Sequence, residues 1–259
     1  PQNAWAPEDC DRTGAALQNA DSLRILVVGD LMVDAYLLGR VDRISPEAPV
    51  PILRASLRER RPGGAANVAL NLKALGAAVT VGGVIGHDQD GRDLQKALEE
   101  QGMDSDAIVA LSDRRTTVKT RVMSGGQHLL RVDEEDDADL NREDAQQFLE
   151  QLASVLAARS FDAILIEDYD KGALSPMVID GLLRMARDRN IPVTVDPKFR
   201  HFDRYRDVAL FKPNLKELRD GLGLLWEDGD EQAMDQALTE GLNRLQSEWN
   251  PDTVLLTLS

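Results

Sequence analysis

Carboxylates and lysines recur at the ends of short apolar segments of this sequence. Carboxylates can accept hydrogen bonds from sugar hydroxyls or hold Mg²⁺ through water, and lysines can bind phosphates. Together they suit phosphoryl transfer, in which catalysis is mostly positioning and neutralisation of charge. For any single residue of this kind, a helix cap or a solvated turn is the ordinary alternative. The groups are Asp30 and Asp34, Asp168 to Lys171, Asp196 to Lys198, and Lys212 to Glu217.

A second pattern is the glycine-rich stretch RPGGAANVALNLKALGAAVTVGGVIG, residues 61–86, in which Gly63, Gly64 and Asn67 stand at the mouth of an apolar helix. Glycine lets backbone amides approach an anion closely, so a phosphate is one possible ligand. Neither G-x-x-x-x-G-K-[ST] nor G-x-G-x-x-G is present, however. The structural alternative is a tight helix start with Asn67 as its cap.

The elements that must position these groups alternate between strand and helix patterns. Helices are expected over 65–76, where Val68, Leu72 and Leu75 have helical spacing, over 92–102, after the cap Asn141, and after Ser175-Pro176. Such alternation predicts an α/β fold of three layers around a mostly parallel sheet, whose ligands bind at the carboxyl ends of the strands. Strands are expected at 24–30, 78–86, 161–168, 191–196, 208–214 and 253–258.

Two segments depart from this alternation. Residues 40–60 are extended and rich in proline, and residues 115–133 read as two strands around a glycine turn. We expect them to form a small β-sheet lid, from about 36–60 and 114–133, over one end of a domain that spans 23–259. Residues 1–22 are polar and aperiodic and are expected to form a loose arm.

Composition excludes several classes of partner. The 259 residues carry a formal net charge of −15, which argues against a nucleic acid or an anionic membrane. The single cysteine, Cys10, excludes an internal disulfide and favours a reducing, cytoplasmic setting. No apolar run reaches the length of a membrane span, and the first residues lack the layout of a signal peptide.

The run from Gly63 to Ala69, followed by Gly76 and Gly86, resembles the N-terminal signature of the ribokinase family of carbohydrate kinases. The resemblance implies a ribokinase-like fold in which the glycine pair approaches a sugar and Asn67 bonds its hydroxyls. Residues 27–53, 116–135, 167–175 and 195–218 are similar to the heptose-7-phosphate kinase branch. That branch uses ATP and Mg²⁺ to phosphorylate the anomeric hydroxyl of D-glycero-D-manno-heptose 7-phosphate, which supplies activated heptose for cell-envelope lipopolysaccharide.

The same resemblance implies roles for individual residues. The sugar would be bound by Asp34, Asn67, Gly63 and Gly64, and its 7-phosphate by Lys119, Arg121 and Arg131. Near the substrate would lie Asp168 and Lys171, and near the transferred phosphate Lys198. The ATP site would contain Asn214, Leu215, Lys216 and Glu217, of which Asn214 and Glu217 would lie at Mg²⁺. Ordinary alternatives are a solvated strand face for Lys119 and Arg121 and a first-turn carboxylate for Glu217. Residues 133–139 are expected to be an acidic surface turn, and the three histidines have no metal spacing.

The sequence departs from the family in one respect, because it contains no Gly-Ala-Gly-Asp element. In the family this element supplies an anion hole and the aspartate base, so no catalytic residue is assigned here; the base and part of the adenine pocket are expected beyond Ser259. A start at Pro1 also suggests a piece of a longer polypeptide. Alternatives are another sugar kinase of the family, a non-catalytic sugar- or nucleotide-binding module, and a dinucleotide oxidoreductase. The exposed edges of the lid predict a homodimer.

Overall fold

A computed structural model describes residues 19–227 and 229–258, and its centre is a seven-stranded sheet with the order β11-β10-β9-β8-β1-β4-β5. Every pairing within it is parallel, which confirms the predicted α/β sheet. The strand β5 was not predicted. The strands are β1 (Arg24–Gly29), β4 (Ala78–Gly86), β5 (Asp104–Leu111), β8 (Ala163–Glu167), β9 (Val193–Asp196), β10 (Leu210–Phe211) and β11 (Thr253–Val254).

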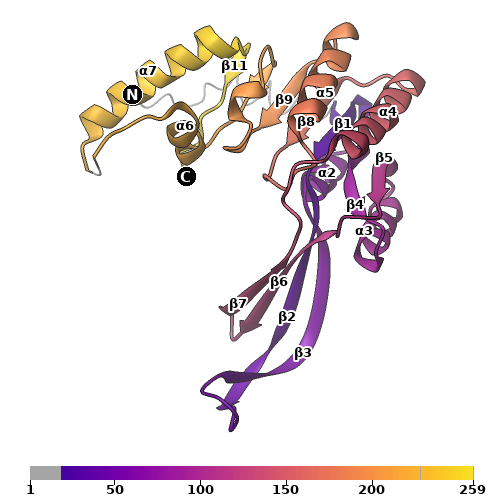
Figure 1. Ribbon diagram of the computed structural model, residues 1–259, viewed down its shortest axis with the longest axis vertical. Coiled ribbons are helices and arrows are strands. Elements are labelled where there is room, and N and C mark those ends of the chain that lie inside the picture. Colours follow the sequence, from indigo (N-terminus) through magenta and orange to yellow (C-terminus); the bar gives the residue numbers. More distant parts are fainter. Residues whose placement is uncertain (1–18, 228, 259) are drawn as a thin grey trace.

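Helices cover both faces of this sheet, as Figure 1 shows. Leu26 and Val28 of β1 belong to one apolar core with α4 and α5, and Ile25 and Val27 to a second core with α2 and α3. Both faces of β1 are therefore buried, which explains its continuous apolar run. The helices are α2 (Ala65–Ala74), α3 (Gln89–Glu100), α4 (Arg142–Ala158), α5 (Pro176–Asp188), α6 (Leu215–Leu222) and α7 (Glu231–Trp249), with 3₁₀ turns η1 (Ala20–Ser22) and η2 (Phe202–Arg204).

The buried face of α2 differs from the prediction. Ala65, Ala66 and Ala69 are fully buried, whereas Leu75 is 52% exposed. The cause is close packing: a β-carbon on Gly29 of β1 would lie 3.0 Å from the Ala65 methyl. Helix and sheet approach too closely here for the larger side chains that helical spacing favours.

Local signals for helix starts were largely correct. Asn141 caps α4, since its Oδ1 accepts a hydrogen bond from the Asp144 N–H at 2.9 Å. Ser175 does occupy the N-cap of α5 before Pro176, but its hydroxyl makes no capping hydrogen bond.

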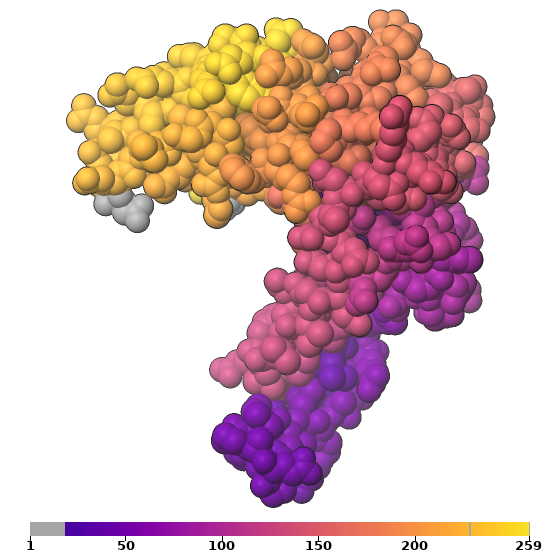
Figure 2. Space-filling view, viewed as in Figure 1, coloured from indigo at the N-terminus to yellow at the C-terminus, as the bar shows by residue number. Residues whose placement is uncertain are grey.

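The lid is a separate four-stranded sheet with the order β3-β2-β6-β7, which confirms the predicted small sheet. Its strands are β2 (Leu31–Ile44), β3 (Pro51–Gly64), β6 (Thr117–Ser124) and β7 (Gln127–Glu134). It begins earlier than expected, because β2 starts one residue after Asp30, next to the end of β1. The long β2–β3 hairpin extends away from the central sheet (Figure 1), and Figure 2 shows an open angle between it and the part formed by α6 and α7.

Strand order locates the ligand site. From β1 the chain continues outward through β4 and β5 on one side and through β8 to β11 on the other. Ligands of open parallel sheets bind at the carboxyl ends of the strands where the order reverses, here β1 and β8. Of the expected N-terminal arm, residues 1–18 lie outside the described residues and 20–22 form η1. Within the described part, none of the helices is both long and apolar enough to cross a membrane.

Candidate active site

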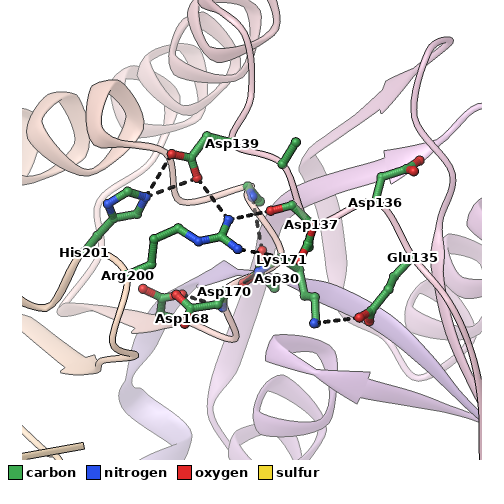
Figure 3. A network of polar contacts seen from close by, with 12 residues as sticks. Asp30, Glu135, Asp136, Asp137, Asp139, Asp168, Asp170, Lys171, Arg200 and His201 are labelled. Atoms are coloured by element: carbon green, nitrogen blue, oxygen red, sulfur yellow. Dashed lines mark hydrogen bonds and ion pairs between the residues drawn. The ribbon is translucent and has the colours of Figure 1, made fainter. Parts of the chain in front are cut away.

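Asp30 stands at this reversal point and fixes the loop after β8. Its Oδ2 accepts hydrogen bonds from the backbone N–H groups of Tyr169 at 2.8 Å and Lys171 at 3.0 Å, and its Oδ1 accepts one from Ala173 at 3.1 Å. Burial raises the pKa of the Asp30 carboxyl, and these three donors oppose the rise. Asp30 therefore shapes the loop that presents Lys171 (Figure 3).

Asp168 has a similar structural role. Its Oδ2 accepts a 2.6 Å hydrogen bond from the Tyr205 hydroxyl, and its Oδ1 accepts one from the Asp170 N–H at 2.8 Å. Burial and the nearby charge of Asp30 raise the pKa of Asp168 to about 6. Asp168 is only 2% exposed, so these hydrogen bonds hold its carboxylate inside the protein, beside the loop that presents Lys171. That Asp168 lies near the substrate stays a prediction.

The glycine pair and Asn67 lie beside the base of the lid. Gly64 has φ +57°, a conformation that favours glycine, and is the N-cap of α2. A β-carbon on Gly63 would lie 2.5 Å from Asp34 Oδ2, so glycine is needed for that carboxylate to lie against the backbone. Asn67 is exposed in the first turn and is not the cap, so the alternative reading of Asn67 is wrong.

The inner part of the lid brings together the predicted anion-binding residues. Asp34, Lys119 and Asp133 are direct neighbours across β2, β6 and β7, and Arg121 pairs with Arg131 two residues further along. Lys119 and Arg121 therefore share one face, as their spacing predicted. Arg121 forms an ion pair with Asp34, and both side chains are less than a quarter exposed. Neither is therefore an ordinary solvated residue.

Lys171 and Lys119 meet at Glu135, which the sequence analysis had placed in an acidic surface turn. Glu135 Oε1 lies 2.8 Å from Lys171 Nζ, and Oε2 lies 2.9 Å from Lys119 Nζ. Burial works against ionisation of Glu135, but its hydrogen bonds to the two lysines outweigh this and lower its pKa. Residues 136–139 are exposed, as expected of an acidic surface segment, but Glu135 is half-buried and connects the lid to the central domain.

The predicted nucleotide residues lie at the carboxyl ends of β9 and β10. Asn214 and Glu217 form a capping box at the start of α6: Asn214 Oδ1 accepts from the Glu217 N–H at 2.8 Å, and Glu217 Oε2 accepts from the Asn214 N–H at 2.9 Å. Glu217 Oε1 pairs with Lys198. Burial acts to lower the pKa of Lys198, but this hydrogen bond raises it overall. A cavity of about 860 Å³ adjoins this group, lined by Asn214, Leu215, Lys216, Arg219, Trp226 and Leu258 among others.

Glu167 and Asp196 are neighbours at the ends of β8 and β9. Burial and the charge of Asp196 raise the pKa of Glu167 to about 7, while Asp196 Oδ2 forms a 2.6 Å ion pair with Lys212. The strand-end pattern had indicated Asp196 and Lys212, but no local pattern indicated that Glu167 is buried.

A magnesium ion fits this region in one way. Among the described residues no group of three or more His, Cys, Asp or Glu side chains could hold a metal. Mg²⁺ usually keeps several waters and is bound by one or two carboxylates together with substrate phosphates. Both Glu217 oxygens are engaged, Oε1 with Lys198 and Oε2 with the Asn214 N–H, so Glu217 suits contact with such an ion through one of its waters.

Sequence reasoning missed the side chains that hold these parts together. Arg114 donates to the backbone oxygens of Asp136 at 2.6 Å, Ala138 at 3.0 Å and Lys171. His201 Nε2 lies 3.1 Å from both oxygens of Asp139. No spacing rule would reveal these contacts, because they join residues far apart in the chain; Figure 3 shows the network around Lys171 and His201.

The chain matches known proteins along most of its length. Residues 22–257 match the model of the pfkB family carbohydrate kinases. The chain is 44% identical over 242 residues to the bifunctional protein HldE of Trichlorobacter lovleyi, covering 93% of this chain and 48% of that protein. It is 41% identical over 238 residues to the D-beta-D-heptose 7-phosphate kinase of Bordetella bronchiseptica, covering 91% and 71%. The chain thus spans about half the length of the first relative.

Solved structures show the same fold. Phosphofructokinase-2 from Escherichia coli in complex with potassium matches with a TM-score of 0.68 at 21% identity, over 91% of this chain and 72% of that one. Ribokinase from Arabidopsis thaliana, complexed with ribose and ATP, matches with a TM-score of 0.59 at 16% identity, over 91% and 72%. The family match over residues 22–257 makes the oxidoreductase alternative wrong. The chain belongs to the pfkB family of carbohydrate kinases.

Proposed function

We propose that this chain binds D-glycero-D-manno-heptose 7-phosphate and ATP, and that it provides the sugar-binding part of a kinase acting on the anomeric hydroxyl. The observation that carries the proposal is the meeting of Lys119 from the lid with Lys171 from the loop after β8. Two ammonium groups at the reversal point suit a sugar that already carries a phosphate. The 41% identity to a heptose 7-phosphate kinase supports this choice of sugar.

In this proposal Asp34, Gly63 and Asn67 contact the sugar hydroxyls at the base of the lid. Lys119, Lys171, Arg121 and Arg131 neutralise the 7-phosphate. Lys198 lies nearer the transferred phosphate, and the cavity beside Asn214 receives part of the nucleotide. Mg²⁺, held by Glu217 and Asn214 through water together with the ATP phosphates, would neutralise charge on the transferred group.

The test is ADP release with Mg-ATP and heptose 7-phosphate, with the product identified by ³¹P NMR. Both the 259-residue chain and any longer natural polypeptide that contains it should be assayed. A 1,7-bisphosphate product supports the proposal. Turnover only with other phosphosugars would favour a different sugar kinase, and binding without turnover by either form would favour a non-catalytic module.

We also propose that the lid mediates a homodimer. Leu130 and Val132 of β7 lie on one face of the lid and are 59% and 43% exposed. Such a surface on a sheet with open edges favours pairing with a second copy. Light scattering at micromolar concentration should give twice the mass of one chain, and Leu130→Asp should reduce it. A monomeric mass for the unmodified chain would contradict the proposal.

A further inference from the structure

The basic side chains assigned to the phosphate of the substrate already have carboxylate partners in this structure. A dianionic ligand that enters this group therefore meets four positive charges that already share three carboxylates. The pairs are Lys119 with Asp133 at 3.4 Å and with Glu135 at 2.9 Å, Lys171 with Glu135 at 2.8 Å, Arg121 with Asp34, and Arg131 with Asp133 at 2.9 Å.

Glu135 differs from the other partners because it joins two separate parts of the molecule. Each of its oxygens faces one ammonium group, Lys119 on β6 of the lid and Lys171 on the loop after β8. The three side chains are 14%, 18% and 22% exposed, so solvent screens their charges only partly. Two oxygens of a phosphate could bridge the same pair of lysines.

The position of Glu135 is fixed by its neighbours in the chain. Arg114 donates to the backbone oxygens of Asp136 and Ala138, and Arg200 donates to that of Asp137. These hydrogen bonds tie the segment after Glu135 to the central domain, as Figure 3 shows. Glu135 is therefore held beside the lysines rather than swinging freely from a turn.

We propose that Glu135 acts as an internal counter-anion that an incoming phosphate must displace from Lys119 and Lys171. The inference rests on the proposed function, because it assumes that these lysines receive the phosphate of the sugar. A phosphate dianion carries more charge and more acceptor oxygens than a carboxylate, so it can displace Glu135. An unphosphorylated sugar has no group that could do so and leaves the two lysines paired with Glu135.

The experiment compares Glu135→Gln with the unmodified chain by calorimetry, using heptose 7-phosphate and, separately, inorganic phosphate. Removing one like charge beside the bound dianion should tighten both affinities by roughly 5- to 20-fold, with a smaller gain at high salt. Asp133→Asn should give a smaller gain, because Asp133 lies farther from Lys119, at 3.4 Å, and its other partner, Arg131, is 58% exposed. Glu134→Gln is the matched control, because Glu134 is exposed and strand alternation turns it to the opposite face of the lid.

Circular dichroism must first show that each variant melts like the unmodified chain. Unchanged or weaker binding by Glu135→Gln, with heptose 7-phosphate bound by the unmodified chain, overturns the role of Glu135 and leaves the proposed function standing. Tighter binding of inorganic phosphate, with heptose 7-phosphate bound by no variant, supports the role of Glu135 and overturns the proposed substrate. Binding of neither ligand by any variant overturns both.

Discussion

Asp30→Asn tests whether a single buried carboxylate shapes the loop that presents Lys171. Asp30 accepts three backbone hydrogen bonds, two at Oδ2 and one at Oδ1. Asparagine replaces one of the two oxygens with an NH₂ group, which cannot accept from an N–H. The least disruptive orientation keeps the contacts of Tyr169 and Lys171 and leaves the Ala173 N–H, in a residue only 3% exposed, without a partner.

The cost follows from that geometry. A hydrogen bond to a charged group contributes about 1.5–3 kcal/mol, and a buried N–H left unpaired costs about 1–3 kcal/mol. Relief from burying a charge offsets part of this, since burial raises the pKa of Asp30. We expect Asp30→Asn to lower the free energy of unfolding by about 2–4 kcal/mol.

Urea unfolding measures this loss, and hydrogen exchange locates it. The amides of Tyr169, Lys171 and Ala173 should exchange faster in the variant, Ala173 most of all. The matched control is Asp162→Asn at the opposite end of the sheet, where the carboxylate accepts from the Arg24 N–H at 2.7 Å but its side chain is 42% exposed. That change should cost less than about 1 kcal/mol. Equal losses for the two variants, or unchanged exchange at Ala173, would refute the reasoning.

Three further substitutions test buried groups by urea unfolding. Tyr205→Phe removes the hydroxyl that donates to Asp168, whose pKa of about 6 exceeds its ordinary 3.8. Because ionisation of Asp168 destabilises the fold as pH rises, the variant should lose about 2 kcal/mol of unfolding free energy at pH 8 and less at pH 5. A larger loss at pH 5 would contradict this. Glu167 has a pKa of about 7 against an ordinary 4.5, so its ionisation likewise lowers stability as pH rises from 5 to 7. Glu167→Gln should therefore raise the free energy of unfolding by up to about 3 kcal/mol at pH 8, relative to the unmodified chain. No gain would refute the raised pKa of Glu167. Lys198→Met leaves the Glu217 carboxylate without its cation. Because Lys198 is 32% exposed, we expect a loss of only about 1–2 kcal/mol in the free energy of unfolding. Adding Glu217→Gln to the same chain should largely remove that loss.

The layers of the fold could be predicted from the sequence because they depend on local patterns. The apolar run before Asp30, the cap at Asn141 and the Ser175-Pro176 start each belong to a short segment and lie where expected. The strand at Asp104–Leu111 was not predicted, although its buried and exposed residues alternate. None of the candidate site residues lies in or directly after it.

The candidate site was only partly predictable. Positions at the strand ends, such as Asp30 and Lys171, followed from the sheet rule, but the partners of their side chains did not. Whether Asp168 faces a ligand or the interior depends on Tyr205, 37 residues later in the chain. Glu135 gave the same signal as any acidic turn, and only the folded lid brings it to both lysines.

The central claim is that Lys119 of the lid binds the phosphate of a phosphorylated sugar. The most direct test is the Kd for heptose 7-phosphate and for unphosphorylated heptose, measured by calorimetry on the unmodified chain and on Lys119→Met. Lys96→Met on α3, with a side chain that is 73% exposed, serves as the control. Lys119→Met should weaken the binding of heptose 7-phosphate by about tenfold or more and leave the binding of heptose unaffected. Equal weakening for both sugars, or no change for either, would contradict it.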